Sequence, residues 1–327
     1  MESRYREESF LEVAVEVTIL LISCCGTILG NVMVLVAVVM KEKLHSPTYF
    51  YYLSLAASDL ILGVLCIPLV IAAFVLHHWP LGDTLCQIYA VLISFSVNSA
   101  IVTLTIISVD RYNALSKPLE TMAEMTVTKR HYKLIIAASW VHSIFWAIGP
   151  LFNWGSTKLD EFTHTCNPNW GGEGLANKSY MLSLAIFAFA LPVGAMVYTY
   201  FRIYRIARAS KRKNVYNLIP SKNETEENAE AAMTKTHASN AGPDEDNKAL
   251  KTVLLLVGSF AACWALYSLA TVWKLINPSS VPPWIVRGGL VLTLCNSCIN
   301  PFIYSIRDGI MKQEIKGLIF KRFCKSS

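Results

Sequence analysis

The sequence has little charge: 16% of its 327 residues are Asp, Glu, Lys or Arg, whereas 54% are hydrophobic and the mean hydropathy is +0.41. A chain of this composition is too apolar to be an ordinary soluble domain. It also lacks a glycine-rich phosphate loop, zinc-ligand spacing and an internal repeat. The composition therefore indicates a membrane protein.

Seven apolar stretches are long enough to cross a bilayer as helices, which takes about 20 residues. The first begins with Glu12 and Glu16, without the basic flank and small-residue cleavage site of a signal peptide, so we expect a retained anchor. The predicted fold class is an all-α membrane protein with a seven-transmembrane helix bundle. The stretches cover residues 12–40, 48–76, 86–110, 131–152, 179–204, 249–274 and 283–305.

Basic residues gather in the loops near 41–45, 117–133 and 202–213 and in the tail 307–325. By the positive-inside rule these segments are expected in the cytoplasm, which places the N-terminus outside a plasma membrane that the chain crosses several times. The net charge of +6 mostly reflects this loop bias. It indicates anionic membrane lipids as a partner and does not indicate nucleic acid.

The expected organisation is a short extracellular N-terminus at 1–11, a transmembrane domain at 12–305 and a cytoplasmic segment at 306–327. Residues 209–248 mix charge, Asn and Ser without apolar periodicity, which predicts a flexible cytoplasmic loop. The last segment contains the basic amphipathic stretch KQEIKGLIFKRFCKSS, expected as a short cytoplasmic helix 8. Cys324 within it is a candidate for palmitoylation, with an unmodified thiol as the alternative.

Two of the nine cysteines differ from the rest by position. Cys86 begins the third stretch and Cys166 lies in the loop after the fourth, both on the expected oxidising side. A disulfide between them would tie that loop over the mouth of the bundle. The six cysteines inside the stretches are expected to be small buried hydrophobic residues.

Asp59 is the only acid well inside any apolar stretch. A charge at bilayer depth is costly and usually faces the bundle interior or water, so Asp59 is a functional candidate. The alternative is that polar groups merely hold helices together. The polar residues that could hydrogen-bond with Asp59 across the bundle are Asn31, Asn296, Ser297 and Asn300.

Short motifs follow one another through the seven stretches, with one placement in each. They are GNVMV at 30–34, LAASD at 55–59, WPLGDTLC at 79–86, DRY at 110–112, Trp140, Pro192 with Tyr200, CWALY at 263–267 and NPFIY at 300–304. Together they resemble those of a rhodopsin-like (class A) G-protein-coupled receptor, over almost the whole chain. The resemblance implies a receptor, not an enzyme, that passes an extracellular or membrane-derived signal to a heterotrimeric G protein as helix 6 moves outward. Arrestin and receptor kinase are further partners that it implies.

In such receptors the DRY arginine is held by its neighbouring acid and often by an acid at the inner end of the sixth helix. Here Asp246 precedes Trp264 by eighteen residues, about five turns, so Arg111 would pair with Asp110 and Asp246. A surface ion pair worth about 0–1 kcal/mol is the alternative. The resemblance assigns the G-protein switch to Asp110, Arg111, Tyr112, Tyr200, Asp246, Asn300, Pro301 and Tyr304.

Deeper residues resemble two further elements of the family. One is an activation core, for which simple core packing is the alternative. The other is a sodium pocket around Asp59, where Ala100 replaces a common serine, so a proton or water is the alternative to the ion. The core would comprise Ile101, Pro192, Phe260 and Trp264, and the pocket Asp59, Asn296, Ser297 and Asn300.

The sixth stretch departs from the family pattern because Leu266 stands where a proline is usual. Without the proline ring the backbone hydrogen bond returns and the kink should weaken. An orphan receptor that signals constitutively, without a diffusible agonist, is therefore the alternative function. A transporter is a remote one, because a single buried acid and no inverted repeat argue against it.

The ligand class is predicted by exclusion. Ile93 stands where amine receptors of this family place an aspartate, and Leu294 where opsins attach retinal to a lysine. An apolar or lipid-like small molecule is expected instead, with Lys274 and Arg287 near the mouth able to meet a carboxylate or phosphate. The loop FNWGSTKLDEFTHTCNPNWGG resembles loops of opsins and of some orphan receptors, including one found in cilia. The predicted pocket consists of Ile93, Ser94, Val97, Phe187, Tyr267 and Leu294.

Two Asn-x-Ser/Thr patterns test the orientation. Asn177 lies in an expected extracellular loop and is a predicted glycosylation acceptor, whereas Asn223 lies on the cytoplasmic side and should stay bare. Three extracellular histidines, His77, His78 and His164, could form a metal cluster, although solvated loop histidines are more common.

Overall fold

The computed structural model describes residues 10–116, 129–217, 243–277 and 280–324. Seven helical stretches in this part of the chain are long and apolar enough to cross a membrane, as predicted. The elements are α1 (Phe10–Met40), η1 (Glu42–Leu44), α2 (Pro47–Ile61), η2 (Leu62–Cys66), α3 (Ile67–Leu76), α4 (Gly82–Ser116), α6 (Lys129–Ile148), η3 (Gly149–Phe152), β1 (Thr157–Leu159), β2 (Cys166–Pro168), α7 (Leu175–Ser183), η4 (Leu184–Ala190), α8 (Leu191–Asn217), α10 (Pro243–Ile276), α11 (Pro283–Arg307) and α12 (Gly309–Cys324).

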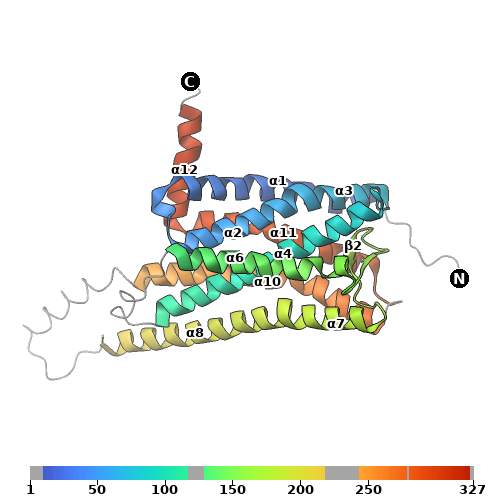
Figure 1. Ribbon diagram of the computed structural model, residues 1–327. Helices are drawn as coiled ribbons and strands as arrows, with labels where there is room; N and C mark the ends of the chain where they lie inside the picture. The colour runs from blue at the N-terminus through green and yellow to red at the C-terminus, as the bar shows by residue number, and fades with distance from the viewer. Residues whose placement is uncertain (1–9, 117–128, 218–242, 278–279, 325–327) are drawn as a thin grey trace, which may run out of the picture.

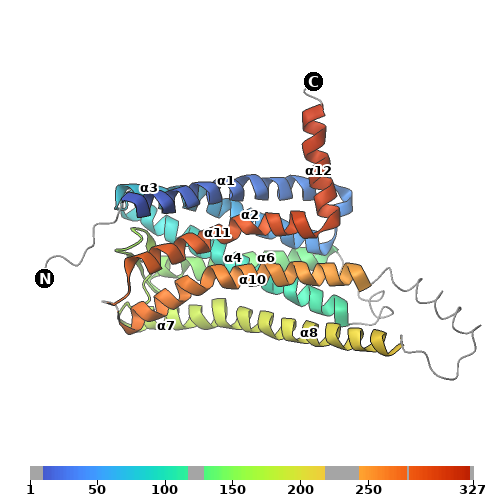
Figure 2. The ribbon, with the colours of Figure 1, turned by 180° about the vertical axis from the view of Figure 1, so that it is seen from behind.

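The long helices run side by side along one axis, and α12 lies across that axis (Figures 1 and 2). At one end of the bundle β1 and β2 form an antiparallel hairpin in which Leu159 is opposite Cys166. We call this the disulfide end, and the opposite end, which holds Asp110 and Arg111, the DRY end.

Local sequence explains several helix boundaries. Pro47 and Pro283 stand in the first turns of α2 and α11, where their fixed φ suits a helix and no amide hydrogen is needed. His77 ends α3 in the left-handed conformation with φ of 56°, a common way to stop a helix.

Two membrane helices contain π-helical segments. η2 lies between α2 and α3, and η4 lies between α7 and α8. A π turn adds a residue to the usual helical turn, so the residues on either side no longer keep the α-helical spacing. Which side chains near η4 face the interior of the bundle therefore cannot be predicted by counting residues along the sequence.

The predicted loop 209–248 is shorter than expected. α8 continues to Asn217 and α10 already begins at Pro243, while residues 218–242 lie outside the described part. Lys, Arg and Ala favour helix in 207–213, and a helix that projects away from a core needs no apolar periodicity.

A large apolar cluster fills the DRY half of the bundle. It joins α2, α4, α10 and α11 through buried residues such as Tyr52, Leu104, Phe260 and Tyr304. α10 and α11 also approach closely near the other end, because a Cβ at Gly289 would lie 2.9 Å from the Tyr267 Cα. Only glycine allows that approach.

α12 is held at the DRY end by contacts with the residues just after α1 and at the start of α2. Asp308 Oδ1 accepts hydrogen bonds from Tyr49 Oη at 3.1 Å and from the Met311 amide at 2.9 Å. Glu314 forms an ion pair with Lys41 at 3.1 Å. The predicted eighth helix is therefore present and anchored beside the first two membrane helices.

Candidate functional site

A cavity of about 380 Å³ lies between the helices in the disulfide half of the bundle. Its wall comes from η2, α4, η4, α10 and α11, and β2 and the residues after it contribute to it. None of the described residues that line it is charged. Small-molecule sites are usually apolar cavities of this kind. Five of the six predicted pocket residues line it: Ile93, Ser94, Val97, Tyr267 and Leu294.

Phe187 is not among the residues that line the cavity. Its ring is 51% exposed and stacks on Trp146 of α6 at a centroid distance of 6.2 Å. Phe189 lines the cavity instead. Both residues lie in η4, where the π-helical turn changes which side chains face inward.

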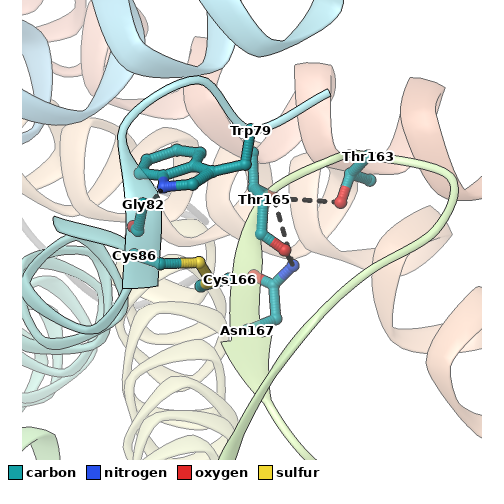
Figure 3. The surroundings of a disulfide bond; sticks show 7 residues. All are labelled: Trp79, Gly82, Cys86, Thr163, Thr165, Cys166 and Asn167. Carbon is teal, nitrogen blue, oxygen red and sulfur yellow. Dashed lines mark hydrogen bonds between the residues drawn. A yellow bond between two sulfur atoms is a disulfide. The ribbon is translucent and has the colours of Figure 1, made fainter. Parts of the chain in front are cut away.

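Asn167 and Pro168 of β2 form part of the cavity wall at the disulfide end, and Figure 3 shows this strand beside the disulfide. The predicted disulfide is present: Cys86 at the start of α4 is bonded to Cys166 of β2, with a Cα–Cα distance of 5.4 Å. Beside it the Thr163 and Thr165 hydroxyls are 2.9 Å apart, and Asn167 Nδ2 donates to Thr165 Oγ1 at 3.2 Å. These hydrogen bonds lie within residues 163–167 and fix the conformation of the strand next to the disulfide.

The two cations expected at the mouth are paired with acids of the chain itself. Lys274 Nζ lies 2.6 Å from Asp160 Oδ2, and Arg287 Nη2 lies 2.6 Å from Glu16 Oε2. Arg287 is 3% exposed and its guanidinium lies over the ring of Phe74. The expectation that Lys274 and Arg287 meet an acidic ligand is therefore corrected: both charges already have partners in the described structure.

Asp160 is fixed from several directions. Its Oδ1 accepts hydrogen bonds from the backbone amides of Phe162 and Thr163 at 2.9 and 3.0 Å. Burial alone would raise the pKa of this carboxyl, but the hydrogen bond and charge of Lys274, with the two amides, lower it below its ordinary value. The acid is therefore held in its charged form.

The floor of the cavity is aromatic. Trp264 lines it and stacks on Phe260 at a centroid distance of 5.6 Å. Phe260 belongs to the same apolar cluster as Ile101, and Trp264 packs against that cluster. Thr105 Oγ1 donates to the carbonyl of Pro192 at 3.3 Å, which joins α4 to α8 at this level. Of the residues predicted as the activation core, Ile101 and Trp264 line the cavity, and Phe260 packs with them directly beneath it.

Asp59 is 2% exposed and accepts two hydrogen bonds from α11. Ser297 Oγ donates to Oδ1 at 2.7 Å, and Asn300 Nδ2 donates to Oδ2 at 2.9 Å. Asn31 does not join them: its Nδ2 donates to the carbonyls of Thr27 and Ser297. Asn296 is buried, and its Oδ1 has no hydrogen-bond partner among the described residues.

The oxygen atoms around Asp59 fit a small hard cation. The carboxylate and the Ser297 hydroxyl are oxygen ligands, and Asn300 Oδ1 is buried without a hydrogen-bond partner among the described residues. Ala100 supplies no oxygen from α4. Elsewhere, no three His, Cys, Asp or Glu side chains in the described part gather closely enough to hold a metal, so His77, His78 and His164 form no cluster.

At the DRY end Arg111 and Asp110 meet a residue that the sequence analysis missed. Thr48 Oγ1 donates to Asp110 Oδ2 at 3.3 Å, and Arg111 Nη2 donates to Thr48 Oγ1. The direct distance between Arg111 Nη2 and Asp110 Oδ2 is 3.8 Å. The backbone of Asp246 lies in α10, but its side chain is outside the described part, so its pairing with Arg111 stays a prediction.

The tyrosines assigned to the switch lie in separate contacts. Tyr304 is fully buried and stacks on Tyr52 of α2 at a centroid distance of 4.1 Å. Tyr200 Oη accepts a hydrogen bond from Ser108 at 3.5 Å. Tyr112 lies under the guanidinium of Arg202. Asn300 and Pro301 are buried in α11 directly below Asp59.

The predicted glycan at Asn177 conflicts with the geometry. Asn177 is 6% exposed, its Nδ2 donates to the carbonyls of Asn169 and Gly172 at 2.9 and 3.1 Å, and its Oδ1 accepts from Ser156. A sugar on this nitrogen would replace one of its two N–H groups, so at least one of the two donated hydrogen bonds would be lost. Asn223 and the side chain of Cys324 lie outside the described part, so both of their predictions stay open.

Two part-buried contacts were not found from the sequence. Glu16 had a signal, because an acid inside an apolar stretch needs a partner, yet nothing indicated Arg287, 271 residues away. Thr48 had none, since its contact depends on how α2 packs against α4.

Comparisons with known proteins agree with this architecture. The family model described as 7 transmembrane receptor (rhodopsin family) matches residues 30–304. The chain is 30% identical over 310 residues to the human Alpha-1A adrenergic receptor, covering 89% of this chain and 65% of that receptor. It is 30% identical over 318 residues to G-protein coupled receptor 161 of Danio rerio, covering 94% of this chain and 59% of that protein.

The squid rhodopsin crystal structure is similar with a TM-score of 0.78 at 23% identity, covering 93% of this chain and 85% of that one, which shows the fold. The chain spans less than two thirds of the length of the two curated relatives named above. The family match, however, covers most of the chain and contains the DRY and NPFIY motifs. The resemblance seen in the sequence is confirmed, and the chain belongs to the rhodopsin family of seven-transmembrane receptors.

Proposed function

We propose that the protein is a receptor that couples a ligand in the cavity to a heterotrimeric G protein at the DRY end. The observation that carries this proposal is a continuous path of packed side chains. Trp264 touches the cavity and stacks on Phe260, and the apolar cluster that contains Phe260 extends to Tyr52 and Tyr304. A ligand that moves Trp264 therefore changes packing next to Asn300 and Pro301. Outward movement of the DRY half of α10 would then open the site for the G protein.

The proposed ligand is a small uncharged apolar or lipid-like molecule. The cavity presents apolar groups with a few hydroxyls and amides, such as those of Ser94, Asn98 and Ser268. An ionic ligand would meet no opposite charge on this wall, and burying an unpaired charge is costly. Neither a ligand amine nor retinal has an anchor at Ile93 or Leu294.

The proposed orientation places the N-terminus and the disulfide end outside the plasma membrane. Exposed basic residues at the DRY end, including Lys43, Arg202 and Arg205, support this by the positive-inside rule. The same cations and α12 would lie against anionic lipid, with a palmitoyl group on Cys324 as one anchor. Arrestin and a receptor kinase would use the same end as the G protein.

The proposed role of Asp59 is to bias the switch according to what it binds. If sodium is the bound ion, Asp59, Ser297 and Asn300 would hold it, and the ion would supply positive charge to the carboxylate. A proton or water on Asp59 is the alternative, which Ala100 favours.

Signalling without a diffusible agonist is the second candidate. The observation that favours it is Leu266: α10 runs from Pro243 to Ile276 without an internal proline. A helix with its full hydrogen-bond ladder has a different balance of straight and bent forms. A shift of a few kcal/mol is enough to exchange the populations of two such states.

The test measures cyclic AMP, basally and after forskolin, in cells that express the chain or its Arg111→Ala variant at matched surface level. A basal change that disappears in the variant supports constitutive coupling and identifies the G-protein class. If the basal signal does not change, uncharged lipids and sterols are screened as ligands. The response to each is then measured both as intracellular calcium and as G-protein dissociation. If no G-protein class responds in any of these assays, the proposed function is rejected.

A further inference from the structure

Part of the cavity wall is also an outer surface of the bundle. Phe189 in η4 and Val272 and Leu275 in α10 all line the cavity, yet they are 38%, 54% and 46% exposed. Among the described residues that line the cavity, these three are the most exposed, so the wall is least covered between η4 and α10. We call this part of the wall the side opening.

The side chains that flank this opening are small where the two helices face each other. Ala185 of η4 and Ser268 of α10 line the cavity beside the exposed residues. Small side chains leave space between the helices that a larger residue would fill. A single aromatic substitution at this place should therefore close the opening.

The depth of the side opening places part of it in the hydrocarbon layer. Phe189 follows Leu175, the first residue of its membrane helix, by fourteen residues, about 20 Å of helix. On α10, Ser268 precedes the end of the helix by eight residues, about 12 Å, and Val272 by four, about 6 Å. The opening therefore extends from near the disulfide end of α10 to the level of Phe189, and its deeper part lies within the roughly 30 Å hydrocarbon core, where it faces lipid chains.

The direct route from water is covered by the segment that carries the hairpin. Its Cys166 is bonded to α4 and its Asp160 is paired with α10 through Lys274. Its Phe162 packs against the apolar cluster of Ala270, Val281 and Val286, which joins the ends of α10 and α11. These contacts fix the segment on three helices above the cavity.

We infer that the cavity is loaded from the side: an uncharged lipophilic molecule dissolved in the bilayer enters between η4 and α10. This inference rests on the proposed ligand site and adds its route and ligand source. The route requires no separation of the hairpin from the bundle. It also selects for molecules that partition into lipid, because a charged molecule would have to cross hydrocarbon to reach the opening.

The experiment places a thiol on the far wall of the cavity and compares access from lipid and from water. The full-length Ser94→Cys chain in lipid nanodiscs is treated with membrane-partitioning N-cyclohexylmaleimide or with a trimethylammonium methanethiosulfonate in water. The labelling rate of the unsubstituted chain, which comes from its native cysteines, is subtracted from each rate. The result is divided by the rate that the same reagent gives with Glu161→Cys, an exposed position in the loop before β2. We expect the normalised rate with the lipophilic reagent to be at least tenfold higher.

Closing the side opening supplies the decisive comparison. Ala185→Phe or Ser268→Phe should slow lipophilic labelling of Ser94→Cys at least tenfold, whereas Leu269→Phe, on the lipid-facing side of α10, should leave it unchanged. Equal or faster labelling by the charged reagent, labelling unaffected by both blocking variants, or no labelling at all would overturn side entry. Labelling needs no signalling, so this result is independent of whether a G protein responds.

Discussion

The guanidinium of Arg287 lies 4.1 Å from the centre of the Phe74 ring while two of its nitrogens donate to Glu16 Oε2, at 2.9 and 2.6 Å. Three helices, α1, α3 and α11, therefore meet at one cation. A buried guanidinium that loses its carboxylate keeps its charge without compensation, which costs more than the pair contributes.

Glu16→Gln should therefore lower the free energy of unfolding by about 2 kcal/mol or more. The measurement is the thermal midpoint in detergent, with Glu12→Gln, an exposed acid one turn away, as the matched control. Equal midpoints for the two variants would mean that the pair contributes nothing beyond surface charge.

Thr48→Ala should raise ligand-free signalling. The Thr48 hydroxyl lies between Asp110 and Arg111, and hydrogen bonds to charged groups contribute about 1.5–3 kcal/mol. Their loss frees the arginine and favours the state that binds a G protein. Basal cyclic AMP at matched expression measures this, and Ser46→Ala, at the same helix start, controls for helix capping. A basal signal that does not change in Thr48→Ala would remove Thr48 from the switch.

No glycan should be attached at Asn177 in the folded receptor. Ser179→Ala removes the acceptor pattern without changing Asn177, so glycosidase treatment should leave wild type and variant with the same mobility. Asn177→Asp, which cannot donate to the Asn169 and Gly172 carbonyls, should cost about 1–3 kcal/mol of stability. A glycosidase shift present in wild type and absent in Ser179→Ala would contradict the first expectation.

The Asp160–Lys274 pair should stabilise the receptor across neutral pH. The pKa of Asp160 is lowered in the folded state, so its contribution is present above the ordinary Asp value of about 3.9 and is lost as pH falls below it. Wild type should exceed Asp160→Asn by about 1–2 kcal/mol at pH 6, and the difference should shrink as pH falls from the ordinary Asp value toward the lowered pKa of Asp160. Melting in detergent between pH 6 and the acid limit of folding checks it, and Glu161→Gln should follow wild type. A difference between wild type and Asp160→Asn that does not change with pH would point to packing instead.

The seven spans and the disulfide could be predicted because each depends on local pattern or on one strong constraint. Long apolar runs identify helices, and two cysteines on an oxidising side indicate a bond. Pocket residues counted along α4, α10 and α11 were also found, since those helices keep α-helical spacing through the cavity. Phe187 was misplaced because the π-helical turn of η4 leaves no sequence signal.

Charge pairing was the other point at which the sequence was insufficient. Lys274 and Arg287 appeared available to a ligand because their partners, Asp160 and Glu16, lie far away in the chain. Thr48 could not be assigned for the same reason. Such contacts depend on how helices cross, and residue type alone does not determine that.

The close approach between Gly289 of α11 and Tyr267 of α10 makes this contact a pivot about which α10 can tilt. With no side chain between Gly289 and the Tyr267 backbone, the two helices are in direct contact there, which makes this height a natural fulcrum. Lys251 lies sixteen residues from Tyr267, about 24 Å along the axis, so a tilt of about 10° would displace it by roughly 4 Å. The short arm beyond the fulcrum, held by Lys274 and Asp160, would move by much less. Small rearrangements beside the cavity would thus be magnified at the far end, and a larger residue at position 289 would shift the fulcrum itself.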